Sequence, residues 1–146
     1  MNMTSQHKGY LAYQQAHANE LEQATLILMM FSGGIDFINK ALKLWGKDKT
    51  VMSEYISKAK NVLLELISSL NIEESGEIGQ FLFSAYKGLF IKLTAAHIQD
   101  DIQKITEVRD SLIELEETWK EVFKSEEYRM FKKNKDYVKT VNYAQR

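Results

Sequence analysis

Residues 51–70 read VMSEYISKAKNVLLELISSL, and this stretch decides the fold. Its apolar residues recur at alternating spacings of four and three, at Met52, Ile56, Ala59, Leu63, Leu66 and Leu70. That is the heptad spacing by which one face of an α-helix packs against another helix. The stretch therefore predicts an amphipathic helix that shares a core with partner helices.

Three further stretches, at residues 19–45, 78–96 and 102–122, repeat apolar residues at the same spacings. In the first, Asn19 with Glu22 three residues later has the spacing of a capping box. Short polar segments at 46–48, 71–76 and 97–100 separate the four stretches and predict turns. We therefore predict an all-α protein, an antiparallel up-down four-helix bundle.

The chain divides into three parts by composition. Residues 1–18 are polar and predict a flexible N-terminal arm, and residues 19–123 hold the bundle. Residues 124–146 form a basic C-terminal extension, in which seven basic and three acidic residues give a net charge of +4. We expect a short extra helix over 126–135 and a frayed tail after it.

The composition excludes several classes of protein. The 146 residues contain no proline and no cysteine, so disulfides, thiolate metal sites and cysteine nucleophiles are absent. The net charge of −1 gives no global footprint of a nucleic-acid-binding protein. The densest apolar run, residues 26–31, is far shorter than the ~20 residues of a membrane span. With no apolar signal segment in the first twenty residues either, we expect a cytoplasmic domain without membrane insertion.

No catalytic constellation is present in the sequence. The residues three before the histidines are Thr4, Gln14 and Thr94, so the Glu-x-x-His motif of di-iron bundles is missing. Ser32-Gly33-Gly34 lies inside a helical pattern, where close helix packing is a better interpretation than a phosphate loop or a nucleophile. We expect no enzyme activity, no metal and no cofactor.

Apolar side chains exceed what a four-helix core needs. In the third helix Phe83 and Phe90 lie beside the seam, with Tyr86 between them, and the first helix is apolar beyond one stripe. Two interpretations stay open: the chain's own arm and tail cover this surface, or it is a groove for a partner helix. The outer face of the last helix is strongly acidic, which disfavours a nucleic-acid role for the basic extension. A solvated or partner-pairing tail is the better interpretation of it.

Several motifs, taken in order, resemble those of one known family. Tyr10, Tyr13, Gln14 and Gln15 resemble its N-terminal tyrosine-and-glutamine motif. Residues 26–33, LILMMFSG, are similar to its signature Leu-Ile-Leu-Met-Leu-Tyr-Asp-Gly. Matching segments continue through the later helices at 66–71, 76–78, 82–96 and 107–119. The likeness covers about residues 10–123, and the family that the chain resembles is the flagellar secretion chaperones of the FliS type.

Three departures from the family pattern stand out. Glu22-Gln23 occupies the place of the family's Ser-Pro step, and Phe31-Ser32 replaces its Tyr-Asp pair. The second change removes a hydroxyl and a carboxylate, so their polar role does not carry over. Residues 124–146 extend past the family's usual end.

The resemblance implies a non-enzymatic cytoplasmic chaperone of flagellin. Such proteins bind the C-terminal segment of new flagellin, prevent premature polymerisation and hold it for export by the flagellar type III secretion apparatus. The export apparatus and regulatory proteins are further partners that the resemblance allows. The alternative is a four-helix adaptor or signalling module that binds a regulatory protein. The predicted partner-binding residues are Tyr10, Tyr13, Gln14, Gln15, Ile27, Met30, Phe31, Phe83, Tyr86 and Phe90.

Overall fold

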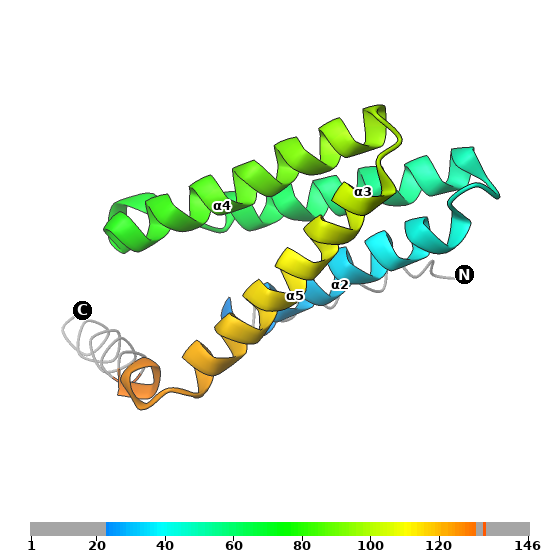
Figure 1. The fold of residues 1–146 in the computed structure, drawn as a ribbon. Coiled ribbons are helices and arrows are strands. Elements are labelled where there is room, and N and C mark those ends of the chain that lie inside the picture. The colour runs from blue at the N-terminus through cyan, green and yellow to red at the C-terminus, as the bar shows by residue number, and fades with distance from the viewer. Residues whose placement is uncertain (1–22, 131–132, 134–146) are drawn as a thin grey trace, which may run out of the picture.

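The computed structural model describes residues 23–130 and 133 of the chain. Within these residues there is no strand, and four long helices follow one another: α2 (Gln23–Leu44), α3 (Lys49–Ser68), α4 (Ile72–Ile98) and α5 (Ile102–Lys124). Each helix runs antiparallel to the next (Figure 1). The predicted all-α, up-down four-helix bundle is confirmed.

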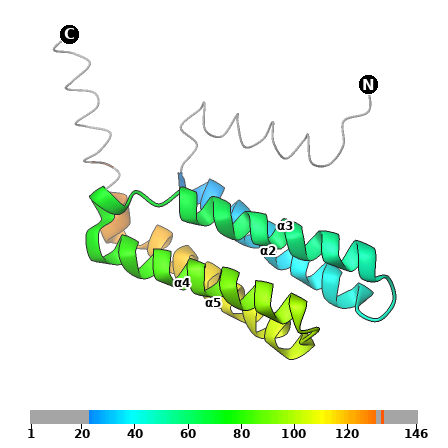
Figure 2. The same ribbon diagram turned by 90° about the horizontal axis from the view of Figure 1, so that it is seen from above.

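The four helices close into a ring around one core. α2 packs against α3 and α5, and α4 packs against the same two helices. Seen from above, the pair α2 and α3 lies beside the pair α4 and α5 (Figure 2). The α2–α3 contact is the most extensive of the four and the α4–α5 contact the least.

Aspartates and one glycine define the turns before α3 and α5. Gly46 adopts φ +76°, the left-handed conformation that commonly ends a helix, and α3 begins directly after Asp48. The Asp48 carboxylate accepts a hydrogen bond of 3.1 Å from the backbone N–H of Val51. At α5, Asp101 accepts an equal bond of 3.1 Å from the N–H of Lys104. Both carboxylates satisfy a backbone donor that the helix itself leaves unpaired.

The turn predicted at 71–76 is wrong over most of its length. Residues 72–75 are already helical, and the chain bends inside α4 at Gly76, with φ +56° and ψ −128°. A glycine without Cβ tolerates this backbone conformation, which allows the first helical turn to point away from the rest of α4. The predicted helix of 19–45 ends at Leu44, and its predicted start at 19–22 lies outside the described residues.

The core includes the predicted seam of α3, whereas Ile78, where the predicted apolar repeat of 78–96 begins, is 70% exposed. Met52, Ile56, Ala59, Leu63 and Leu66 are all buried, and residues from the other three helices complete the cluster. Gly34 allows close approach there, since a Cβ at this position would lie 3.2 Å from Val62 Cγ1. The predicted close packing at the glycine pair is therefore confirmed for Gly34, whereas Gly33 has no atom within 4 Å of such a Cβ.

α2 is long and apolar enough, by length and composition alone, to cross a membrane. In this structure it is a core helix of the bundle, with Leu26, Phe31 and Ile38 buried in the shared core. After α5 the chain is extended at Ser125, and residues 126–130 are helical again.

Candidate partner-binding site

A groove lies between α4 and α5 on the outside of the bundle. The two helices leave their short connection at an angle, so the N-terminal half of α4 and the C-terminal half of α5 lie apart (Figure 1). The groove holds a cavity of about 350 Å³, lined by Ala85, Leu89, Ser111, Glu114, Leu115 and Thr118. It is the place where the least tightly packed helix pair leaves side-chain surface uncovered.

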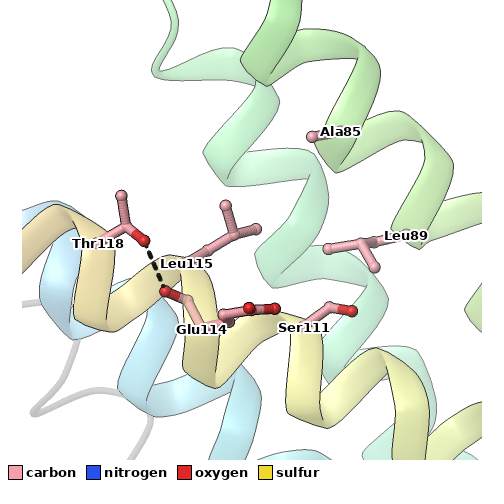
Figure 3. Close-up of a pocket in the computed structure, with 6 residues that line it drawn as sticks. All are labelled: Ala85, Leu89, Ser111, Glu114, Leu115 and Thr118. Carbon is pink, nitrogen blue, oxygen red and sulfur yellow. Dashed lines mark hydrogen bonds between the residues drawn. The ribbon is translucent and has the colours of Figure 1, made fainter.

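Helical spacing brings these residues onto the facing sides of the two helices. Ala85 and Leu89 are four residues apart on α4, and Ser111, Leu115 and Thr118 recur at four and three on α5. Leu89 and Leu115 are half-buried, and both project into the space between the helices (Figure 3). The short side chains of Ala85 and Ser111 leave the cavity open beside them. The groove therefore has an apolar floor.

The Thr118 hydroxyl donates a hydrogen bond of 2.9 Å to the backbone carbonyl of Glu114 one turn earlier, so it makes no polar demand on an occupant (Figure 3). Among the described residues, no buried side-chain nitrogen or oxygen lacks a hydrogen-bond partner. No cluster of His, Asp or Glu in the described part could hold a metal ion. The groove is suited to binding by apolar contact.

An aromatic cluster supports the groove from behind. Tyr86 is only 1% exposed, and its hydroxyl accepts a hydrogen bond of 3.1 Å from the Trp119 indole N–H. Its ring also meets Phe31 of α2 edge to face, with centroids 6.1 Å apart. Burial raises the pKa of Tyr86, an effect that the Trp119 hydrogen bond partly opposes. The cluster therefore fixes α4 relative to α5 and α2 through a neutral phenol.

The two edges of the groove differ in character. On the α4 side Phe81 lies one turn before Ala85 and is 69% exposed, and Ile78 near it is 70% exposed. On the α5 side the edge carries carboxylates. At the narrow end Lys92 and Glu107 form an ion pair of 2.7 Å that joins the two helices. An apolar edge thus faces an acidic one across an apolar floor.

A second hollow, of about 500 Å³, continues along α5 beyond Thr118. Its lining residues are Glu121, Val122, Ser125, Glu127 and Tyr128. Aromatic rings pack along this end of the helix, with centroid distances of 5.2 Å for Trp119–Phe123 and 5.1 Å for Phe123–Tyr128. Partial burial raises the pKa of Tyr128. The apolar surface therefore extends to the last described helical turn.

The structure divides the predicted site residues into three groups. Met30, Phe31 and Tyr86 are buried in the core, and Phe31 and Tyr86 touch each other there. A direct partner contact by these three requires the bundle to open, and it stays a prediction. Ile27 is half-buried on α2. The arm residues Tyr10, Tyr13, Gln14 and Gln15 lie outside the described residues.

Phe83 and Phe90 are half-buried on the side of α4 that faces α3. Lys60 of α3 lies over the Phe90 ring, 5.4 Å from its centroid, and Lys87 lies 6.0 Å from the centroid of Phe83. These rings therefore do not line the α4–α5 groove. Whether they contact a partner stays a prediction.

Sequence reasoning missed the residues that line the groove. The apolar repeats of 78–96 and 102–122 predict Leu89 and Leu115 as core residues, and they do not single out Phe81. The row Phe81, Ala85, Leu89 has a constant spacing of four, which places it beside the seam on one flank of α4. This spacing indicates that the three residues share one flank of α4, but it does not show that α5, the helix facing that flank, diverges from α4.

Comparison with known proteins gives a consistent result. The family model described as "Flagellar protein FliS" matches residues 6–126. The "Flagellar secretion chaperone FliS" of Bacillus subtilis (strain 168) is 31% identical over 120 residues, which are 80% of this chain and 87% of that protein. The protein of the same name from Campylobacter jejuni (subsp. jejuni serotype O:6, strain 81116 / NCTC 11828) is 27% identical over 118 residues, 80% of this chain and 92% of the relative.

Proposed function

The chain belongs to the FliS family of flagellar secretion chaperones, and on this premise we propose that it is a non-enzymatic cytoplasmic chaperone of flagellin. It binds the C-terminal segment of flagellin, prevents premature polymerisation and holds the subunit for export by the flagellar type III secretion apparatus. The further proposal is the place of binding: the α4–α5 groove receives an amphipathic helix of flagellin.

The single observation that carries this placement is the uncovered apolar floor of the groove. Leu89 and Leu115 are half-buried beside a cavity of about 350 Å³, and Phe81 stands 69% exposed at its edge. An amphipathic helix recognises such a surface with side chains at spacings of three and four. Flagellin side chains would fill the cavity while Phe81 packs against the flank of the bound helix.

The free energy gained by burying apolar side chains in the groove must exceed the cost of ordering a segment that folds as it binds. Ordering a disordered segment costs about 2–5 kcal/mol of the interaction energy. Fully burying a large apolar side chain contributes about 1.5–3 kcal/mol. Several anchors along the groove are therefore needed to offset the ordering, and Phe81 is the anchor with most surface left to bury.

The N-terminal arm is the second element of the proposal. In line with the family resemblance, Tyr10, Tyr13, Gln14 and Gln15 cover partner surface when the chaperone is empty, and they leave it when flagellin binds. Removing residues 1–18 then removes a competitor and raises the apparent affinity for a flagellin C-terminal peptide. Unchanged affinity and association rate in calorimetry and stopped-flow mixing would rule this competition out.

Co-expression with flagellin tests the function, and a matched pair of variants tests the site. Phe81→Ser and Ile91→Ser both change an exposed apolar residue of α4, 69% and 57% exposed, but Ile91 lies on the outer face away from the groove. We expect Phe81→Ser to weaken flagellin binding about tenfold, which corresponds to ~1.4 kcal/mol. Ile91→Ser should bind as the unchanged protein does, and both variants should melt alike.

Phe90→Ala extends the same experiment to the surface predicted from the sequence. If Phe90→Ala weakens binding beyond its effect on the melting temperature while Phe81→Ser does not, flagellin binds on the α3 side of α4. Failure to form a stoichiometric complex with flagellin, with a regulatory protein as the dominant co-purifying species, would favour the adaptor alternative.

A further inference from the structure

A row of carboxylates follows the outer face of α5 beside the groove. Its members recur at alternating spacings of three and four: Glu107, Asp110, Glu114, Glu117 and Glu121. Glu107 pairs with Lys92 and Asp110 with Arg109. The other three form no ion pair with any described residue. Of these three, Glu114 lines the first cavity and Glu121 the second, whereas Glu117 lies about 100° around the helix from Thr118, away from the groove.

The groove leads to residue 130, where the continuously described part of the chain ends. Thr118 of the first cavity and Val122 of the second lie one turn apart on α5. The second cavity is lined by Tyr128, two residues before the end of the helical residues 126–130. Any segment that continues from residue 130 therefore begins at the wide end of the groove.

The segment that continues from residue 130 carries basic and apolar residues that complement the carboxylates and the apolar floor of the groove. Residues 131–146 read FKKNKDYVKTVNYAQR, where five basic residues and one acidic residue give a net charge of +4. Lys132, Lys135, Lys139 and Arg146 recur at spacings of three, four and seven, so on a helix they would form one basic row. Phe131, Val138 and Val141 would form an apolar row directly beside it.

We propose that residues 131–146 dock into the α4–α5 groove of the same chain as an amphipathic helix. The apolar row covers Leu89 and Leu115, and the basic row runs along Glu114 and Glu121. As a helix the segment is about 24 Å long, and the stretch from Ser111 to Val122 is about 16 Å long, so the segment spans the groove. The segment of residues 131–146 also lies beyond residue 126, where the match to the family model ends.

With this contact, residues 131–146 cover the groove, as the N-terminal arm is proposed to cover partner surface. The attraction between the two rows is partly exposed to solvent and weakens at high salt, because screening shortens its range. Any partner helix that uses the groove must first displace the segment. The contact itself does not depend on the identity of that partner.

Cysteine cross-linking in the full-length protein tests the contact directly, because the chain has no cysteine of its own. Thr118→Cys lies in the groove, and Asn134→Cys lies on the apolar side of the segment, where an antiparallel helix would bring it near Thr118. The control pairs Asn134→Cys with Asn61→Cys, an exposed position on α3, the helix diagonal to α5. A short bismaleimide reports which pair meets.

We expect the Thr118 pair to form the intramolecular cross-link about tenfold faster than the Asn61 pair, since docking raises the effective concentration of the two thiols. Adding Lys132→Glu, Lys135→Glu and Lys139→Glu, or raising the salt to about 0.5 M, should remove most of that advantage. Equal rates for the two pairs would overturn the proposal. Cross-links mainly between two chains would also overturn it, in favour of a second copy as the occupant. Because flagellin is absent from the assay, neither result depends on the proposed function.

Discussion

Replacing Gly33 and Gly34 by alanine, one at a time, should affect the stability of the bundle differently: Gly33→Ala should stabilise it, and Gly34→Ala should not. Both residues lie in the middle of α2, where a glycine is less favourable than alanine by about 1 kcal/mol. At Gly33 no atom lies within 4 Å of an added Cβ. Gly33→Ala should therefore raise the free energy of unfolding by about 1 kcal/mol.

At Gly34 the same gain is opposed by a steric contact. The added Cβ would lie 3.2 Å from Val62 Cγ1, 3.6 Å from Val62 Cβ and 3.8 Å from Leu112 Cδ1. Val62 is stiff at χ1 and its neighbours are buried, so the helices must separate slightly, at a cost of about 1–3 kcal/mol. Gly34→Ala should therefore be neutral or destabilising by up to about 2 kcal/mol.

Urea unfolding followed by far-ultraviolet circular dichroism measures both variants on one scale. The expected gap between them is about 1–3 kcal/mol, and each kcal/mol corresponds to roughly 2–4 °C in melting temperature. Val62→Ala in the Gly34→Ala background should recover part of the loss, and a double-mutant cycle gives the coupling. Equal stabilisation by both alanines would refute the close approach of α2 and α3 at Gly34.

Three further substitutions test other parts of the fold. The pKa of Tyr86 is raised in the folded state, so the contribution of its neutral phenol to the free energy of unfolding is complete below pH 10.0 and is lost as the pH rises through the folded-state pKa. Tyr86→Phe should therefore make the free energy of unfolding, measured by denaturant titration, less dependent on alkaline pH. Asp101→Ala removes the N-cap bond to the Lys104 N–H and should lower the free energy of unfolding by about 1 kcal/mol, whereas Asp101→Asn should retain most of it in the same titration. Gly76→Ala forces a Cβ onto φ +56° and should destabilise by about 1–3 kcal/mol in calorimetry, although no atom lies within 4 Å of the added carbon.

Periodicity was sufficient to predict the architecture. In α3, five of the six seam residues chosen by spacing alone are buried, and Leu70, the sixth, is half-buried beyond the helix end. The heptad spacing fixes which face of a helix is apolar, and short turns fix which helices are neighbours. The loop at 71–76 was predicted too long, because Glu73, Glu74 and Ser75 look like turn residues although they form a helical turn before Gly76.

Periodicity was not sufficient to place the binding surface. On α4 apolar residues lie nearly all around the helix, so the spacing of Phe83 and Phe90 could not say whether α3 or solvent meets them. The structure places Lys60 of α3 over Phe90, and it places the uncovered surface on the opposite flank, at Phe81 and Ala85. The groove arises from the angle between α4 and α5. The apolar spacing within either helix does not determine this angle, because it depends on how the two helices pack together.

The closed ring of helices has a consequence for the order in which the protein folds. α2 and α3 form the most extensive contact and are joined by a four-residue turn, so this hairpin depends only on local contacts, which form fast. The ring closes when α5 packs against α2, and α5 is the last of the four helices to be synthesised. Until then the α2 surface that α5 will cover remains open on the growing chain. A protein of this architecture therefore exposes part of its own apolar helix α2 during synthesis, until α5 has emerged and covers it.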